Sequence, residues 1–286
     1  MENKKLLVGI VIVAAILGFL VYHFLVPQAA VTKIQEEKIM EKIAKEGKLK
    51  ACYIVYPPMV IKDPNTGKLS GEMIDAVEYI SKEAGLKVEY TETAWGTFIA
   101  ALQSKQCDVV VTGLFSRIER AKTVAFTKPM FYIGNSALIK KGDARFKTLD
   151  DFNKTGVKIA VIQGEVGHLY AQKNLPTAEL VVLLGADISL ALAQVSAGKV
   201  DAAFTDGWTI EAYAKEHPET QDFLEVNPAA SYGINPVTWA VRQGDADLLT
   251  FLNTAIIDLE ADGKFLEFEE KYDAHWLRPE FELKKS

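Results

Sequence analysis

Two stretches, ALQSKQCDVVVTG at residues 101–113 and AQVSAGKVDAAFTDG at residues 193–207, share one pattern. Each begins with the end of a helical segment and continues into a short apolar run typical of a buried strand. Each run ends at polar residues and glycine. Loops at the carboxyl ends of strands are where open α/β sheets hold their ligands. The repeat therefore predicts two sheets with two ligand-facing edges.

The segments around these stretches alternate between helix and strand. Residues 157–162, VKIAVI, read as a strand that ends at Gln163 and Gly164, followed by a helix over residues 165–173. Free N–H groups at the start of such a helix attract an anion. The same alternation favours a mostly parallel sheet, with a turn at residues 64–67 joining a hairpin. We expect the further elements at residues 50–55, 72–84, 86–90, 95–104, 238–242, 248–261 and 265–272.

The N-terminal region contains an apolar run from Leu6 to Val26, preceded by Lys4 and Lys5. Its length is close to the ~20 residues that cross a bilayer as a helix. The sequence therefore predicts a transmembrane anchor over residues 1–26 rather than a cleaved signal, with the rest of the chain outside the cytoplasm. Residues 27–47 predict a linker helix.

Composition excludes some functions. The chain has 286 residues and a formal net charge of −6, which argues against a nucleic-acid surface. Neither a cofactor motif nor a metal-ligand spacing stands out. Cys52 and Cys107 are interpreted as two buried thiols, although pairing in an oxidising compartment stays open and would add about 4 kcal/mol in the chain-entropy model.

Five stretches together resemble the periplasmic-type amino-acid-binding proteins of family 3, which serve ABC importers. They are residues 67–85, 94–113, 117–129 (RIERAKTVAFTKP), 198–207 (GKVDAAFTDG) and 239–272. The resemblance covers about Lys48 to Trp276 and implies a two-lobed α/β fold of the periplasmic-binding type II class. Lobe 1 is expected at residues 48–133 and 236–286, and lobe 2 at residues 134–235, with hinge strands near residues 131–138 and 233–237. A small zwitterionic ligand and a transporter permease are the implied partners.

The resemblance also implies roles for individual residues. Arg120 matches the arginine that holds the ligand's α-carboxylate, and Asp206 matches the aspartate that receives its α-ammonium group. Tyr56 matches the aromatic residue that covers the ligand's side chain, and Trp95 matches a second aromatic wall. Asp206 before Gly207 also fits an Asx turn, so both roles stay open.

The remaining candidates line the loops at the strand ends. Gly113 closes the lobe 1 strand, and Phe115 stands where the family has a hydroxyl, a departure for which Ser116 can compensate. In lobe 2, Gly164 matches the turn before the helix, and Val166 lies in its first turn.

Glu165 occupies a position where the family has Thr or Ser. A carboxylate there would repel the ligand's own carboxylate, so we expect Glu165 to point to solvent or toward a cationic ligand tail. Family members that bind basic amino acids carry an acid where this chain has Tyr53. The sequence therefore predicts an uncharged or aromatic ligand side chain, unless Glu165 turns inward.

Two other functions compete with transport. Cyclohexadienyl dehydratases resemble the same family, but their acid follows a Thr-Asn pair that is absent here, so we expect a protein without enzymatic activity. A sensor ectodomain would need a signalling partner, because the segment before the apolar run is only Met1 to Lys5.

Overall fold

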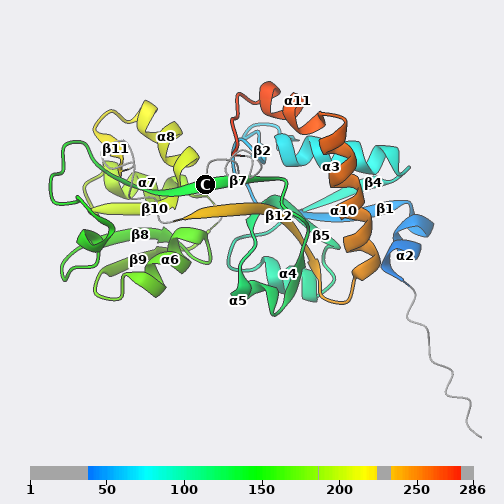
Figure 1. Cartoon of the computed structure of the whole chain (residues 1–286), viewed down its shortest axis with the longest axis horizontal. Helices are drawn as coiled ribbons and strands as arrows, with labels where there is room; N and C mark the ends of the chain where they lie inside the picture. Colours follow the sequence, from blue (N-terminus) through cyan, green and yellow to red (C-terminus); the bar gives the residue numbers. More distant parts are fainter. Residues whose placement is uncertain (1–37, 186, 224–232, 278–286) are drawn as a thin grey trace, which may run out of the picture. The chain divides into compact units, whose positions relative to one another are not determined.

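A computed structural model describes residues 38–185, 187–223 and 233–277. The first group of elements, called lobe 1, contains strands β1, β4, β5 and β6, the short hairpin β2–β3, and six helices (Figure 1). Its strands are β1 (Lys48–Tyr53), β2 (Ile61–Lys62), β3 (Leu69–Ser70), β4 (Lys87–Glu92), β5 (Val109–Phe115) and β6 (Val124–Phe126). Its helices are α2 (Ile39–Glu46), α3 (Glu72–Glu83), α4 (Phe98–Gln103), α5 (Ile118–Ala121), α10 (Ala246–Ala261) and α11 (Lys264–Lys271).

The second group, called lobe 2, follows in one continuous stretch of chain. It consists of η1 (Leu149–Phe152), β8 (Lys158–Ile162), α6 (Val166–Asn174), β9 (Glu179–Leu183), α7 (Ser189–Ser196), β10 (Ala202–Asp206), α8 (Gly207–Glu216) and β11 (Thr220–Asp222). Two longer strands, β7 (Phe131–Lys140) and β12 (Ile234–Arg242), run between the lobes (Figure 1). These two strands overlap residues 131–138 and 233–237, where the sequence predicted hinge strands, and we call this region the hinge. Its action as a hinge stays a prediction.

The main sheet differs from the predicted one in two respects. Its strands follow the order β4-β1-β5-β12-β7-β10-β8-β9 in one hydrogen-bonded path, because residues 131–134 of β7 pair with β12 and residues 135–139 pair with β10. The two expected sheets are thus joined at the hinge. Pairing is parallel only in the outer parts, and β12 is antiparallel to β5, β6 and β7. The expectation of a mostly parallel sheet was therefore wrong at the centre.

Burial explains why these segments form these elements. Every residue of β5 and of β10 is buried, as expected for strands covered on both faces. Helix α3 buries Met73, Val77 and Ile80, which lie on one face at spacings of four and three. Gly71 is the N-cap residue of this helix and has a φ of +112°. A Cβ at this position would lie 2.5 Å from the Met59 carbonyl oxygen. Only glycine fits that approach.

A disulfide joins Cys52 in β1 to Cys107 just before β5, which contradicts the interpretation as two free thiols. Cys52 pairs with Val110 in the parallel β1–β5 ladder, and this register brings the two cysteine Cα atoms to 5.5 Å, inside the range that a disulfide spans. The two linked cysteines are 55 residues apart in the sequence, and both lie in lobe 1.

The predicted anchor over residues 1–26 and most of the predicted linker helix lie outside the described residues. Within the part of the chain that the structure describes, no helix is long and apolar enough to cross a membrane. Helix α2 corresponds to the end of the linker prediction and buries Ile43. The predicted lobe boundaries at residues 133 and 235 stay a prediction.

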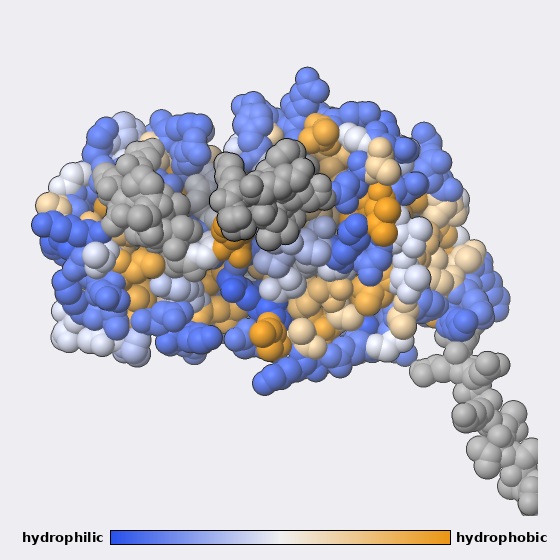
Figure 2. Space-filling model, viewed as in Figure 1, coloured by the Kyte–Doolittle hydropathy of each residue, from blue (hydrophilic) through white to orange (hydrophobic). Residues whose placement is uncertain are grey.

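Hydrophilic residues cover much of the face seen in Figure 2, with smaller apolar patches among them. Large exposed apolar side chains occur in both lobes, among them Ile118 in α5, Leu184 after β9 and Leu266 in α11. Such scattered side chains are ordinary on a surface that faces water.

Candidate functional site

The candidate residues gather where strands of both lobes end beside the hinge. Asp206, the last residue of β10, stands opposite Asn135 of β7 in the sheet. Phe115, the last residue of β5, stands opposite Val237 of β12. Strands β5 and β10, which the sequence repeat predicted, therefore both end beside the hinge strands β7 and β12. The loops that follow them can face one ligand.

Arg120 lies in α5 and is 8% exposed. Its Nη1 donates to the Phe115 carbonyl oxygen at 3.1 Å, and its Nη2 donates to the Gly164 carbonyl oxygen in lobe 2 at 2.5 Å. Phe98 lies beneath the guanidinium, 5.3 Å from Arg120 Cζ to the ring centroid. Burial lowers the pKa of Arg120 to about 10, so the group is still cationic at neutral pH. A buried guanidinium of this kind can bind a carboxylate through two parallel hydrogen bonds.

Asp206 is fully buried and is the N-cap residue of helix α8. Its Oδ1 accepts from the Thr209 backbone N–H at 2.9 Å, and its Oδ2 accepts from the Thr209 hydroxyl at 2.8 Å. Asp206 thus caps the start of α8, whereas the local alternative that the sequence left open was an Asx turn. Burial raises the pKa of Asp206 above its ordinary value, although these donors oppose the shift.

The sequence suggested that Glu165 points to solvent or toward a cationic ligand tail. The structure excludes the solvent-facing position, because Glu165 is 3% exposed and is the N-cap residue of helix α6. Its Oε2 accepts from the Gly167 N–H at 2.7 Å, and its Oε1 accepts from the Thr205 hydroxyl at 3.2 Å. The free N–H groups of the helix draw the carboxyl inward. Burial, together with the charge of Asp206, raises the pKa of Glu165 to about 8.

Tyr56 and Trp95 form an aromatic wall in lobe 1. Their rings meet edge to face, with centroids 5.4 Å apart, and both side chains are buried. The Tyr56 hydroxyl faces Asp206 without reaching hydrogen-bond geometry. Burial and the nearby Asp206 carboxyl hold the pKa of Tyr56 well above its ordinary range, so the phenol is neutral.

Two candidate glycines are needed because other groups pass close to them. A Cβ at Gly113 would lie 2.7 Å from Tyr56 Cε1 and 2.4 Å from Met59 Sδ. Gly164 has a φ of +79°, and a Cβ there would lie 2.8 Å from the Trp95 carbonyl oxygen. Gly164 is therefore one of the points where lobe 2 touches lobe 1.

The other candidates are placed less directly at the site. Phe115 contributes its carbonyl oxygen to Arg120, while its side chain belongs to the core. Ser116 is half-buried, and its backbone N–H donates to the Pro236 carbonyl oxygen at 3.3 Å. Val166 is buried in the core at the first turn of α6.

Sequence reasoning missed several residues that shape the site. Thr205 links the Glu165 and Asp206 carboxyls, and Thr209 completes the Asp206 cap. Thr209 could have been found, because an aspartate three residues before a threonine at a helix start is a capping pattern. His168 Nδ1 accepts from the Gly164 N–H at 3.1 Å and supports the turn that Arg120 contacts.

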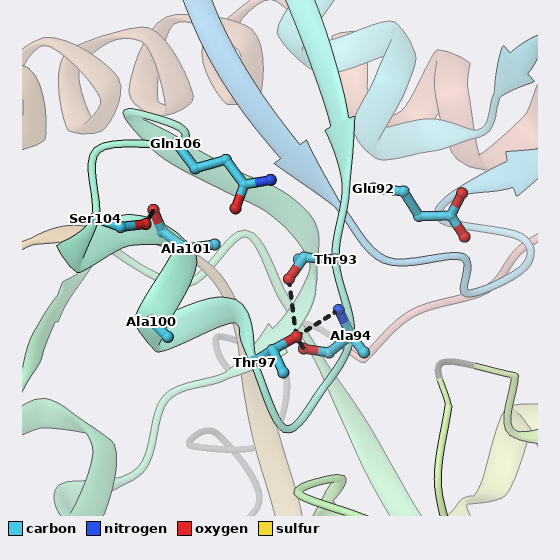
Figure 3. A pocket seen from close by; sticks show the side chains of 8 residues that line it. All are labelled: Glu92, Thr93, Ala94, Thr97, Ala100, Ala101, Ser104 and Gln106. Carbon is cyan, nitrogen blue, oxygen red and sulfur yellow. Dashed lines mark hydrogen bonds between the residues drawn. The ribbon is translucent and has the colours of Figure 1, made fainter.

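A surface hollow of about 600 Å³ lies elsewhere in lobe 1, beside α4 (Figure 3). It is lined by Glu92, Thr93, Ala94, Thr97, Ala100, Ala101, Ser104 and Gln106. The Thr93 and Thr97 hydroxyls bond to each other at 3.1 Å, and none of the candidate residues lines this hollow. It is distinct from the site at the hinge.

Known proteins similar to this chain share its organisation. The chain is 27% identical to the L-cystine-binding protein of Escherichia coli strain K12 over 272 residues, which cover 94% of this chain and 95% of that protein. The crystal structure of an ancestral amino acid-binding protein, a precursor of cyclohexadienyl dehydratase, has a TM-score of 0.72 at 31% identity, covering 82% of this chain and 99% of that one. An ancestral arginine-binding protein bound to arginine has a TM-score of 0.70 at 32% identity, covering 79% and 98%.

The family model for bacterial extracellular solute-binding proteins, family 3, matches residues 49–275. That range takes in both lobes, the hinge strands and every candidate site residue. The two-lobed α/β architecture and the meeting of β5 and β10 at the hinge agree with this assignment. The chain therefore belongs to the bacterial extracellular solute-binding proteins of family 3.

Proposed function

We propose that this protein captures a small amino acid between its lobes, outside the cytoplasm, and delivers it to the permease of an ABC importer. In this proposal Arg120 of lobe 1 binds the α-carboxylate, and Asp206 of lobe 2 binds the α-ammonium group. The observation that carries it is that a buried guanidinium and a buried carboxyl, one from each lobe, lie at the same hinge. Opposite charges at this site match the two ends of a zwitterion.

Arg120 also explains how binding is coupled to lobe closure. Its Nη2 in lobe 1 donates a hydrogen bond to the Gly164 carbonyl oxygen in lobe 2. One of the Arg120 hydrogen bonds therefore connects the two lobes. A ligand carboxylate would add charge-assisted hydrogen bonds to the same group. A ligand that contacts both lobes binds the closed form more tightly and shifts the population toward it.

The aromatic wall suits the rest of such a ligand. Tyr56 and Trp95 present apolar ring surface beside the two charged groups, and Gly113 leaves room for the Tyr56 ring. Aromatic faces bind alkyl chains and can also cover a cation. The site thus combines polar ends with an apolar wall, as expected for recognition of an amino acid.

The proposal includes a membrane tether. The apolar run from Leu6 to Val26 after Lys4 and Lys5 supports an uncleaved N-terminal helix with the lobes outside. A tether would keep the binding protein beside its permease. Membrane fractionation of cells that produce the full chain tests it: a fully soluble mature protein that lacks residues 1–26 would refute the tether and leave export intact.

Ligand binding tests the proposal directly. Small molecules released from the denatured, natively purified protein should include an amino acid by mass spectrometry. Arg120→Ala should weaken its binding about ten- to a hundredfold in calorimetric titrations, because hydrogen bonds to charged groups contribute about 1.5–3 kcal/mol.

The matched control is Arg145→Ala. Arg145 lies in lobe 2, with a side chain that is 61% exposed and pairs with Asp143 and Asp201, so its loss should leave affinity unchanged. Equal affinity of the Arg120→Ala variant and the unaltered protein would show that the site lies elsewhere.

An enzyme on the same fold is the second candidate. Glu165 is a buried carboxyl whose pKa is raised to about 8, a value that suits a general acid, and one similar structure is a precursor of cyclohexadienyl dehydratase. Incubation of the protein with prephenate or arogenate decides the question. Product formation that is lost in Glu165→Gln would favour the enzyme, whereas no turnover favours a binding protein.

A further inference from the structure

The site contains two buried carboxyl groups that share one hydrogen-bond donor. Thr205 Oγ1 lies 3.2 Å from Glu165 Oε1 and 3.4 Å from Asp206 Oδ2. A hydroxyl has a single proton, so Thr205 can donate to only one of these carboxyls at a time. Both side chains are shielded from water, at 3% and 0% exposure respectively. Two carboxylates this close and this deeply buried repel each other.

The groups that face Glu165 do not balance this charge. Arg120 acts on it from α5, but in the described part of the chain Arg120 forms no ion pair with either carboxyl, because its donors go to carbonyl oxygens. Tyr56 is a neutral phenol, and the pKa of His168 on α6 is lowered by burial, which favours neutral imidazole. Asp206 adds a second negative group. One guanidinium therefore faces two carboxyls.

Charge balance then separates two classes of amino acid. With Glu165 protonated, as its pKa of about 8 favours at neutral pH, the cluster carries no net charge, and a neutral amino acid brings no cation to the buried Glu165 carboxyl. A ligand with a second cationic group lets Glu165 ionise and pair with that cation, so the closed site stays neutral and gains an ion pair. Burying the second cation without such an acid would be costly, so Glu165 separates the two classes in binding free energy.

We infer that Glu165 makes the site selective for an amino acid with a cationic side chain over a neutral one. This inference rests on the proposed function and names the ligand class of the same site. Arg120 takes the α-carboxylate, Asp206 takes the α-ammonium group, and Glu165 faces the second cation. The Tyr56 and Trp95 rings cover the alkyl part between the charges. The inward position of Glu165 thus supplies the acid that is absent at Tyr53.

Proton release on binding gives a test that needs no variant. At pH 7 the Glu165 carboxyl is largely protonated, because its pKa is about 8. A cation beside it favours the carboxylate, so arginine should displace about one proton into the buffer, whereas glutamine should displace none. Titration of the purified full chain with arginine, in two buffers that differ in ionisation enthalpy, measures this number.

Affinity gives the second test. The full chain should bind arginine at least about tenfold more tightly than glutamine, a neutral amino acid of similar length. Glu165→Gln should weaken arginine binding about ten- to a hundredfold, abolish its proton release and leave glutamine binding within about threefold. Glu211→Gln is the matched control, since Glu211 is an exposed residue of α8 in the same lobe, and it should change neither ligand's affinity.

The outcomes separate this inference from the proposed function. If glutamine, leucine or phenylalanine binds as tightly as arginine and arginine releases no proton, the selectivity of Glu165 is wrong while amino-acid capture stands. If no amino acid binds, both ideas are wrong. Tight arginine binding that Glu165→Gln leaves unchanged in affinity and proton release would also overturn the inference.

Discussion

Lobe 1 and lobe 2 present opposite chemistry to the site between them. Lobe 1 contributes the guanidinium of Arg120 and the rings of Tyr56 and Trp95, whereas lobe 2 contributes the carboxyls of Glu165 and Asp206 at two helix starts. Neither lobe alone presents both charges of a zwitterion. In the proposed function, recognition therefore requires closure, because a ligand held by one lobe makes only half of its polar contacts.

The lobes also differ in how they are held together. The Cys52–Cys107 disulfide lies wholly within lobe 1, while the buried titratable pair lies in lobe 2. Lobe 1 is therefore stabilised by a covalent link that is insensitive to pH. Lobe 2 contains the carboxyls whose ionisation changes its stability.

Removing the disulfide should destabilise lobe 1. Replacing Cys52 and Cys107 together by alanine should lower the free energy of unfolding by about 4 kcal/mol in the chain-entropy model, given the 55-residue separation. Hydrogen exchange should accelerate in β1 and β5 and stay nearly unchanged in β8 and β9. Equal acceleration in both lobes would show that they unfold as one unit and that the disulfide does not stabilise lobe 1 selectively.

The second effect is a pH dependence that originates in lobe 2. The pKa of Glu165 is about 8 in the folded protein against an ordinary value of 4.5, so the folded state binds this proton more tightly. The resulting stabilisation is complete below about pH 4.5 and is lost as the pH rises through about 8. In the unliganded protein, this group lowers the free energy of unfolding by at most about 1.4 kcal/mol per pH unit within that window.

Urea unfolding at several pH values measures this dependence. The difference between the unaltered protein and Glu165→Gln isolates the contribution of Glu165, because the titration of His168 is common to both. Parallel curves for the two proteins between pH 5 and about 8 would mean that Glu165 does not titrate in this range.

The smallest effect concerns an aromatic contact between the lobes. Trp208 in α8 packs against Trp276 with ring centroids 5.1 Å apart, and Trp276 stacks on Phe131 and donates its indole N–H to Glu72 in lobe 1. Trp208→Ala should weaken ligand binding about two- to tenfold, since aromatic pairs contribute about 0.5–1.5 kcal/mol.

The control for this change is Tyr170→Ala. Tyr170 of α6 stacks on Phe204 of β10 within lobe 2, with ring centroids 6.0 Å apart. Its loss should reduce the stability of lobe 2 and leave ligand affinity nearly unchanged. Equal losses of affinity in the two variants would show that the Trp208 contact has no special role in closure.

Local sequence patterns were enough to predict the strands and helices that carry the site. The buried runs of β5 and β10, followed by glycine-containing loops, predicted both ligand-facing edges, and the family resemblance pointed to Arg120 and Asp206 as candidates at them. These features depend on periodicity and on short motifs, which a single sequence contains.

Features that depend on distant segments could not be predicted in this way. The helix N–H groups that draw Glu165 inward are local, but its second partner, the Thr205 hydroxyl, comes from a strand 40 residues away. The disulfide depends on the β1–β5 register that sets the separation of Cys52 from Cys107. The antiparallel centre of the sheet depends on the return of β12 between β5 and β7.

The position of β12 between β5 and β7, late in the sequence, affects how the chain folds during synthesis. Lobe 2 is one continuous stretch, whereas lobe 1 lacks its central strand until residues 234–242 of β12 have been made. Until then, β5 and β7 each present an unpaired edge that can pair with another chain. Lobe 2 can therefore fold before lobe 1, and the early segments of lobe 1 are the part of the nascent chain that most needs protection from aggregation.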